Sequence, residues 1–382
     1  MTINKRKFLA SFLISFGFLF SCQTLSTSYL DGLKTGPNHP DLDFTNIQNL
    51  VAQGQCTQAI NDIVAYTTKF PTSPYSQSLS LLQNDCLVQT EQFETAANSL
   101  RQLVVYSIDR QPKIAAPAFL LLSYAYEGLG ENDKSLAAAL DAERLGAELP
   151  AHSRLAEVPA RLAMLHSQMS DMTQAGIYLS RADDGIRVLR SQNPQTIGSV
   201  FWAKVYYQMG FKSLDQIDHQ GISNAIQGLM AVQKFTLRSI EFNDPVWSAR
   251  ALNQLQKNYL TLWRLIEIPV ISNSPMWVQD EVKDQRQRSI WIFELEDLIN
   301  QARLFQPHES HPQPPMTVDF FAFLNDLDGK ALALASKSAK KNPLTKESLF
   351  LNSTLRPGHV YPTQFFPNEV ESPNPTPSEE NQ

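Results

Sequence analysis

The recurrence of small side chains inside helical patterns constrains the fold of this chain most. From about residue 44 onward, apolar residues follow a spacing of i, i+3, i+4 and i+7, as in the run from Phe119 to Tyr126, which is the period of an amphipathic helix. Small residues recur within this pattern at intervals of 37, 39 and 40 positions, at Ala59, Ala96, Ser135 and Ala175. Because small side chains let two helices pack closely, we expect an all-α fold.

The composition agrees with a helical fold and excludes some functions. The 382 residues include only 15 glycines, so loops that cradle a phosphate are unexpected. The formal net charge is -6, and an acidic chain is a poor match for the phosphate backbone of a nucleic acid. We therefore expect no nucleic-acid partner.

One segment contains both helices of a hairpin. Phe119 to Leu145 is divided at Gly130, and it resembles the tetratricopeptide repeat, a helix–turn–helix unit of about 34 residues. The same frame fits four other segments: Gly54–Ile60, Gln92–Ala97, Leu162–Ala182 and Phe201–Gly210. In two of the repeats the turn glycine is replaced, by Glu91 and by Ser170. The resemblance covers residues 44–210 and implies a superhelix of stacked hairpins.

The resemblance also implies a binding surface. In this family the first helix of each hairpin lines a concave groove, and the frame places there Asp85, Tyr124, Glu127, Gln168, Lys204 and Tyr207. Such a polar and aromatic groove is suited to an extended peptide or a partner helix. The alternative is that the tyrosines only pack between helices.

The N-terminus predicts a targeting signal. Lys5–Lys7 is a basic region, and Phe8–Phe20 is an apolar run too short to span a membrane. The run ends at Ser21 and Cys22, which resembles a bacterial lipobox, although an ordinary signal peptide is the alternative. We expect residues 1–21 to be removed, Cys22 to be lipidated, residues 22–43 to form a flexible spacer, and Gln23 to direct the protein to the outer membrane.

Two cysteines remain once Cys22 carries lipid. The repeat frame places Cys56 at the start of a second helix and Cys86 late in the next first helix, on adjacent antiparallel elements. A disulfide between them and a pair of buried free thiols are both compatible with this placement.

The rest of the chain departs from the repeat. All five tryptophans lie between Trp202 and Trp291, and long amphipathic helices are predicted at residues 222–242, 245–267 and 276–305, with Asp244 as an N-cap. We expect a second helical module over residues 211–305. Residues 306–382 are expected to be a proline-rich segment and a disordered tail, with short helices at 318–324 and 329–341 and an aromatic island at 360–366 that either docks a partner or straps onto the body.

The sequence offers little chemistry. The glycine motifs of nucleotide-binding loops and nucleophile elbows do not occur. His308 and His311 have the wrong spacing for a helical zinc motif and lie between prolines, which indicates a solvated loop. Residues 228–233 are faintly similar to a motif of lytic transglycosylases, but those enzymes need an upstream acid, and no glutamate occurs between Glu157 and Glu241. We expect no enzyme, no cofactor, no metal and no small-molecule substrate.

These features predict an outer-membrane-anchored, periplasm-facing scaffold lipoprotein. Its repeats would bind another envelope protein, with an assembly or accessory role such as that of lipoproteins in outer-membrane protein, secretin or pilus assembly. An activator of a peptidoglycan synthase is the alternative, and a peptidoglycan-cleaving enzyme is third.

Overall fold

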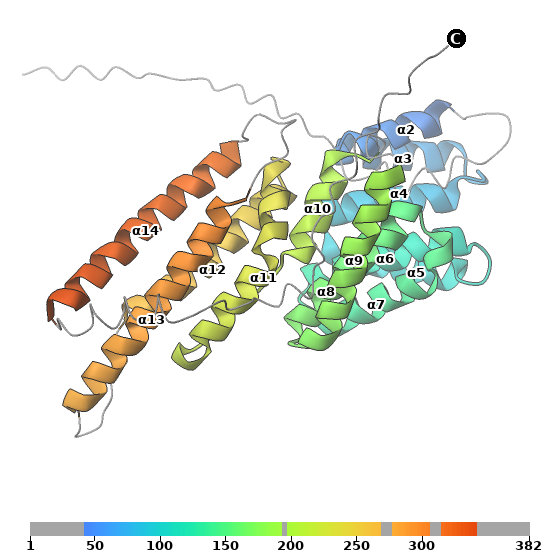
Figure 1. The fold of residues 1–382 in the computed structure, drawn as a ribbon. Helices are drawn as coiled ribbons and strands as arrows, with labels where there is room; N and C mark the ends of the chain where they lie inside the picture. Colours follow the sequence, from blue (N-terminus) through green and yellow to red (C-terminus); the bar gives the residue numbers. More distant parts are fainter. Residues whose placement is uncertain (1–41, 193–196, 269–276, 306–314, 342–382) are drawn as a thin grey trace, which may run out of the picture.

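The computed structural model describes residues 42–192, 197–268, 277–305 and 315–341 (Figure 1). Within these ranges the chain is helical and has no strands, which confirms the all-α class. Several predictions fall outside the described residues: the expected signal peptide and Cys22, most of the expected spacer, the two histidines at 308 and 311, and the chain after residue 341.

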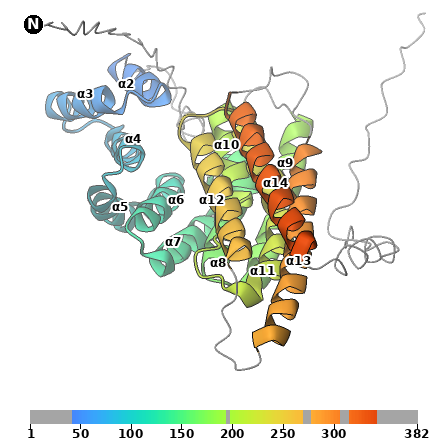
Figure 2. The same ribbon diagram turned by 90° about the vertical axis from the view of Figure 1, so that its left-hand side faces the viewer.

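The first half consists of helices of 11 to 21 residues that pack on their neighbours in sequence (Figure 2). They are α2 (Leu42–Ala52), α3 (Cys56–Lys69), α4 (Ser76–Gln89), α5 (Phe93–Ser107), α6 (Pro112–Gly128), α7 (Asn132–Arg144), α8 (Val158–Gln168), α9 (Met172–Gln192) and α10 (Ser199–Met209). A short 3₁₀ helix (Gly146–Glu148) and a π-helical turn (Ser153–Glu157) connect α7 to α8. Each helix packs against the next from α2 to α8, as expected for consecutive hairpins.

Four tight turns share one backbone conformation. Gly54 and Gly130 have φ of 68° and 74°, and the two residues that replace glycine in the repeat frame, Glu91 and Ser170, have φ of 59° and 63°. This left-handed conformation costs a residue with a Cβ roughly 1–2 kcal/mol relative to glycine. The turns therefore repeat in the backbone even where the sequence does not.

The small residues that recur in the sequence lie at the helix contacts. Ala59, Ala96 and Ser135 are fully buried, and Ala175 is nearly so. The Ser135 hydroxyl also donates to the Ser123 carbonyl oxygen at 2.8 Å, which ties α7 to α6. The 37-to-40-residue intervals thus mark the close contacts within successive hairpins.

The second half is a bundle of helices of 20 to 27 residues. It contains α11 (Ile222–Glu241), α12 (Trp247–Glu267), α13 (Trp277–Arg303) and α14 (Pro315–Lys341), preceded by a single 3₁₀ turn (His219–Gly221). Figure 1 shows these helices running side by side beyond α10.

The prediction for residues 315–341 was wrong. In place of two short helices within a proline-rich tail, α14 is one continuous helix of 27 residues that belongs to the second module. Its buried side chains are spaced by four, three and four positions and share one face: Phe320, Leu324, Leu327 and Ala331. Burial of that face against α11, α12 and α13 outweighs the helix-weakening effect of Gly329.

The start of α12 lies against the first half of the chain, beside the contacts that α10 makes with α11 and α12. The Asp244 carboxylate accepts hydrogen bonds from the backbone N–H groups of Val246 and Trp247, at 3.0 and 2.6 Å, just before the helix. The N-cap position of α12 is Val246 and not Asp244 as predicted, because the helix begins two residues later than expected, at Trp247. The Trp247 indole is buried in the core of the first half, against Tyr124 and Tyr207, with ring centroids 6.3 and 5.6 Å apart. The start of α12 therefore packs against the helices of the first half.

Candidate functional site

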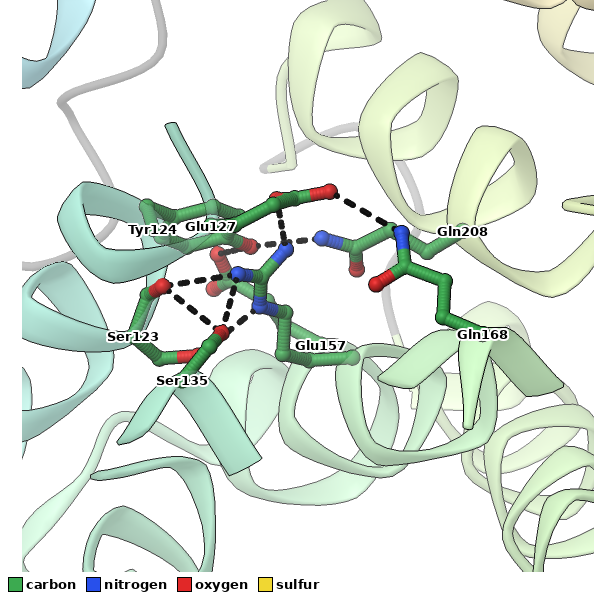
Figure 3. A network of polar contacts seen from close by, with 8 residues as sticks. Ser123, Tyr124, Glu127, Ser135, Glu157, Gln168 and Gln208 are labelled. Carbon is green, nitrogen blue, oxygen red and sulfur yellow. Dashed lines mark hydrogen bonds and ion pairs between the residues drawn. The ribbon is translucent and has the colours of Figure 1, made fainter. Parts of the chain in front are cut away.

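A buried arginine organises a polar network in the middle of the repeats (Figure 3). The Arg161 side chain of α8 is fully buried and donates to the Ser123 hydroxyl, the Ser123 carbonyl and the Ser135 hydroxyl, at 3.0, 2.9 and 3.1 Å. It also forms an ion pair with Glu127 of α6, which accepts a longer bond of 3.4 Å from Gln168. The guanidinium of α8 is thus held by groups of two other helices, α6 and α7.

A second ion pair extends the network to α10. Glu157 ends the π-helical turn and is fully buried, and it pairs there with Lys204. The same carboxylate accepts bonds from the Tyr124 hydroxyl at 3.0 Å and the Ser153 hydroxyl at 2.9 Å. Gln208 donates to the Tyr124 oxygen at 2.8 Å, as Figure 3 shows.

The network is electrically balanced and internal. Two cations, Arg161 and Lys204, face two carboxylates, Glu127 and Glu157. Burial, with the Glu157 charge nearby, raises the pKa of Tyr124 well above its usual range, so the phenol keeps its proton. These groups fix four elements of the fold to one another, and breaking one buried pair removes several favourable contacts at once.

A cavity of about 450 Å³ lies beside this network, where α4, α6, α10 and the start of α12 meet. Its apolar wall is made by Val88, Leu121, Val200, Trp247 and Phe93. The cavity opens to solvent, because the lining residues at its rim are exposed. These residues are Thr90, Glu91, Gly128, Pro245, Val246 and Arg250. This volume lies in the range of pockets that hold small ligands or a few side chains.

Asp85 is the unusual member of the lining. Its side chain is 6% exposed and accepts one hydrogen bond, from Gln89 at 3.2 Å. Burial raises the pKa of this carboxyl from 3.8 to about 6, although the Gln89 bond and the Lys204 charge lower it. A desolvated acid in an open cavity is a physical sign of a binding site.

The other charged residues of the cavity have partners. Arg250 pairs with Glu91 at 3.5 Å, Lys204 pairs with Glu157, and Glu127 pairs with Arg161. Asp244 accepts the backbone N–H groups of Val246 and Trp247. Among the described residues, Asp85 is the lining carboxylate that has neither an ion pair nor a bond from a backbone N–H group.

A disulfide fixes one wall of the cavity. Cys56 at the start of α3 and Cys86 on α4 are joined, with Cα atoms 5.0 Å apart, and Cys56 is part of the lining. The bridge holds the α4 segment that carries Asp85 against the first hairpin. Of the two alternatives for these cysteines, the structure contains the bridged one.

The predicted groove residues gather in one region, although not as a displayed surface. Asp85, Tyr124, Glu127 and Lys204 line the cavity, Gln168 bonds to Glu127, and Tyr207 packs on Trp247. Three of the residues that the repeat frame assigns to the groove are buried: Asp85, Tyr124 and Lys204. For the tyrosines, the alternative of packing between helices describes the structure better, and burial raises the pKa of Tyr207 to about 12.

Three residues of the polar network and the cavity wall were missed by the sequence analysis: Arg161, Glu157 and Trp247. Charged residues within the apolar pattern of residues 156–165 were a usable signal for Arg161 and Glu157, since such residues are seldom buried unless they are paired. The contact between Trp247 and Tyr124 had no local signal, because the two residues are more than a hundred positions apart.

No family model, curated protein or solved structure matches this chain. Within the described ranges, none of the helices is long and apolar enough to cross a membrane. The same residues contain no cluster of three or more His, Cys, Asp or Glu side chains arranged to hold a metal ion.

Proposed function

We propose that this protein is a lipid-anchored adaptor of the bacterial envelope. A tetratricopeptide-like stack of hairpins would hold a segment of another envelope protein in the cavity between α4, α6, α10 and α12. The lipid on Cys22 would keep the binding site within reach of the outer membrane, and the spacer would set that reach. No chemical step is required, since the role is to position a partner.

The regular turns support the tetratricopeptide-like frame. Left-handed backbone at Gly54, Glu91, Gly130 and Ser170 follows the same 37-, 39- and 40-residue intervals as the buried small residues. Helical stacks of this kind bind other polypeptides on a shared face, which makes a binding role the natural expectation for the fold.

The composition of the cavity is the main support for a binding role. Four of the six residues that the repeat frame assigns to a binding face line one open cavity with an apolar wall and a desolvated carboxylate. A protein that served only as a rigid spacer would gain stability by filling this volume with side chains.

Site-specific photo-crosslinking in living cells tests the proposal. A photoreactive amino acid in place of Val246, which is 43% exposed at the cavity rim, is expected to trap a partner. The matched control replaces Val105 on α5, which is 79% exposed and does not line the cavity. Equal trapping from both positions, or adducts within the chain alone, would contradict the proposal.

The identity of the trapped protein separates the functions. A component of outer-membrane protein, secretin or pilus assembly supports an assembly role, and a peptidoglycan synthase supports the activator role. A Cys22→Ala variant tests the anchor separately, because it is expected to leave the membrane fraction while its fold is kept.

A further inference from the structure

We infer that the cavity recognises a lysine or arginine side chain of the partner polypeptide, held by an ion pair with Asp85. This inference rests on the proposed function and adds the chemistry that selects the partner. It assigns the otherwise unpaired carboxylate a role in binding.

The distribution of charges in the cavity favours a cation. Arg250 and Lys204 are already paired with Glu91 and Glu157, so an anionic ligand would have to break an existing pair before it could bind. A cation needs no such exchange, because Asp85 accepts a single hydrogen bond. Any ligand carboxylate that reached the α4 wall would instead be repelled by Asp85.

The shape of the cavity favours a long basic side chain. Its mouth lies at exposed residues such as Glu91 and Val246, whereas Asp85 is buried in the wall. Val88, Leu121 and Val200 lie along the lining and suit the apolar stem that lysine and arginine carry behind the charge. Because about 450 Å³ exceeds the volume of one side chain, neighbouring residues of the partner would fill the rest, so we favour a polypeptide over a small amine.

The wall that carries Asp85 is rigid. The Cys56–Cys86 bridge involves the residue next to Asp85, and the Asn84 amide beside it donates to the Ser80 carbonyl at 2.8 Å and the Ser99 hydroxyl at 2.9 Å. A carboxylate held in place before binding loses little entropy when a cation arrives. A charged hydrogen bond of this kind is also among the stronger polar contacts available to a protein.

Selection from a library of random heptapeptides displayed on phage tests the inference. The purified full chain, as processed by its host, is immobilised, and enriched peptides are synthesised with their basic residue intact or replaced by norleucine. We expect each enriched family to contain lysine or arginine at a fixed position. Norleucine should weaken binding at least about tenfold, which corresponds to about 1.4 kcal/mol.

A double-mutant cycle locates the contact. In an Asp85→Asn variant, which keeps an oxygen to accept the Gln89 bond, the norleucine replacement should change binding less than about twofold. Asp109→Asn on the exposed loop before α6 is the matched control and should retain the full effect. Thermal unfolding of both variants checks that their folds are kept.

The outcomes distinguish this inference from the proposed function. Enriched peptides without a basic residue, or a norleucine effect that persists in Asp85→Asn, overturn the inference and leave peptide binding intact. Failure to enrich any peptide that competes for the cavity overturns both. Crosslinks from residue 246 to the chain's own terminal segments would also overturn the inference, because the cavity would then be occupied by the protein's own chain and not by a partner.

Discussion

Among the described side chains, Asp85 and Lys204 line the same cavity without forming an ion pair, because the Lys204 ammonium is committed to Glu157. Asp85 therefore remains desolvated, with one hydrogen bond from Gln89. The desolvated Asp85 carboxylate lowers the stability of the folded state, and it is available for an ion pair with a cation.

The first prediction concerns Asp85 and stability. A pKa raised from 3.8 to about 6 means that the folded state binds this proton more tightly than the unfolded chain does. Ionisation of Asp85 therefore destabilises the fold above pH 6, and the penalty disappears as the pH falls from 6 towards 3.8. Asp85→Asn should raise the free energy of unfolding at pH 7.5 by about 1–3 kcal/mol.

Urea unfolding at pH 7.5 and pH 5 measures this effect. The wild type and Asp109→Asn should share the same dependence on pH, and Asp85→Asn should show a smaller loss of stability between pH 5 and 7.5. A destabilised Asp85→Asn protein at pH 7.5 would show that the carboxylate is satisfied in the folded state.

The second prediction concerns the buried ion pair. Glu157→Gln leaves the Lys204 ammonium, which is 2% exposed, without its counter-charge, so the free energy of unfolding should fall by about 3–5 kcal/mol. Combining Glu157→Gln with Lys204→Met should recover part of the loss, since no charge is then left buried at this pair. The exposed Lys330–Asp326 pair on α14 is the control, and Asp326→Asn there should cost less than about 1 kcal/mol.

The third prediction concerns the disulfide. Cys56 and Cys86 close a loop of 30 positions, and removing that constraint by a double change to alanine should lower the free energy of unfolding by about 3–4 kcal/mol. Reduction should add the mass of two hydrogen atoms to the intact protein. It should also weaken peptide binding, because Cys56 lines the cavity. A protein isolated from the envelope with two free thiols would contradict the assignment.

The fourth prediction uses the repeated turns. Ser170 has φ of 63°, so Ser170→Gly should stabilise the fold by about 1 kcal/mol. Gly130→Ser is the reciprocal change, with φ of 74° and no atom within 4 Å of an added Cβ, so strain in the backbone is the expected source of its destabilisation. Thermal unfolding of the two variants should show shifts of opposite sign.

The sequence predicted the local parts of this structure best. The helix period, the small residues and the turn positions are properties of short segments, and the hairpins from α2 to α9 follow from them. The predicted bounds 222–242 and 245–267 lie within two residues of α11 and α12 at each end.

Contacts across long separations were not predictable from those patterns. The ring contact between Trp247 and Tyr124 and the ion pair between Glu157 and Lys204 depend on how the hairpins stack. The stacking of hairpins is not determined by the local sequence pattern of any one segment. The same cause explains α14, whose face is buried by helices that precede it. As a result, four of the six residues assigned to the groove lie together at one cavity, but the burial of three of them was not predicted.

Photo-crosslinking from residue 246 in living cells is the most direct test of the central claim that the cavity holds a partner polypeptide. We predict that one envelope protein is trapped at this position, that the Val105 control gives no such adduct, and that Cys22→Ala reduces the yield by releasing the protein from the membrane. Adducts of equal yield at both positions, or adducts confined to the chain itself, would contradict the claim.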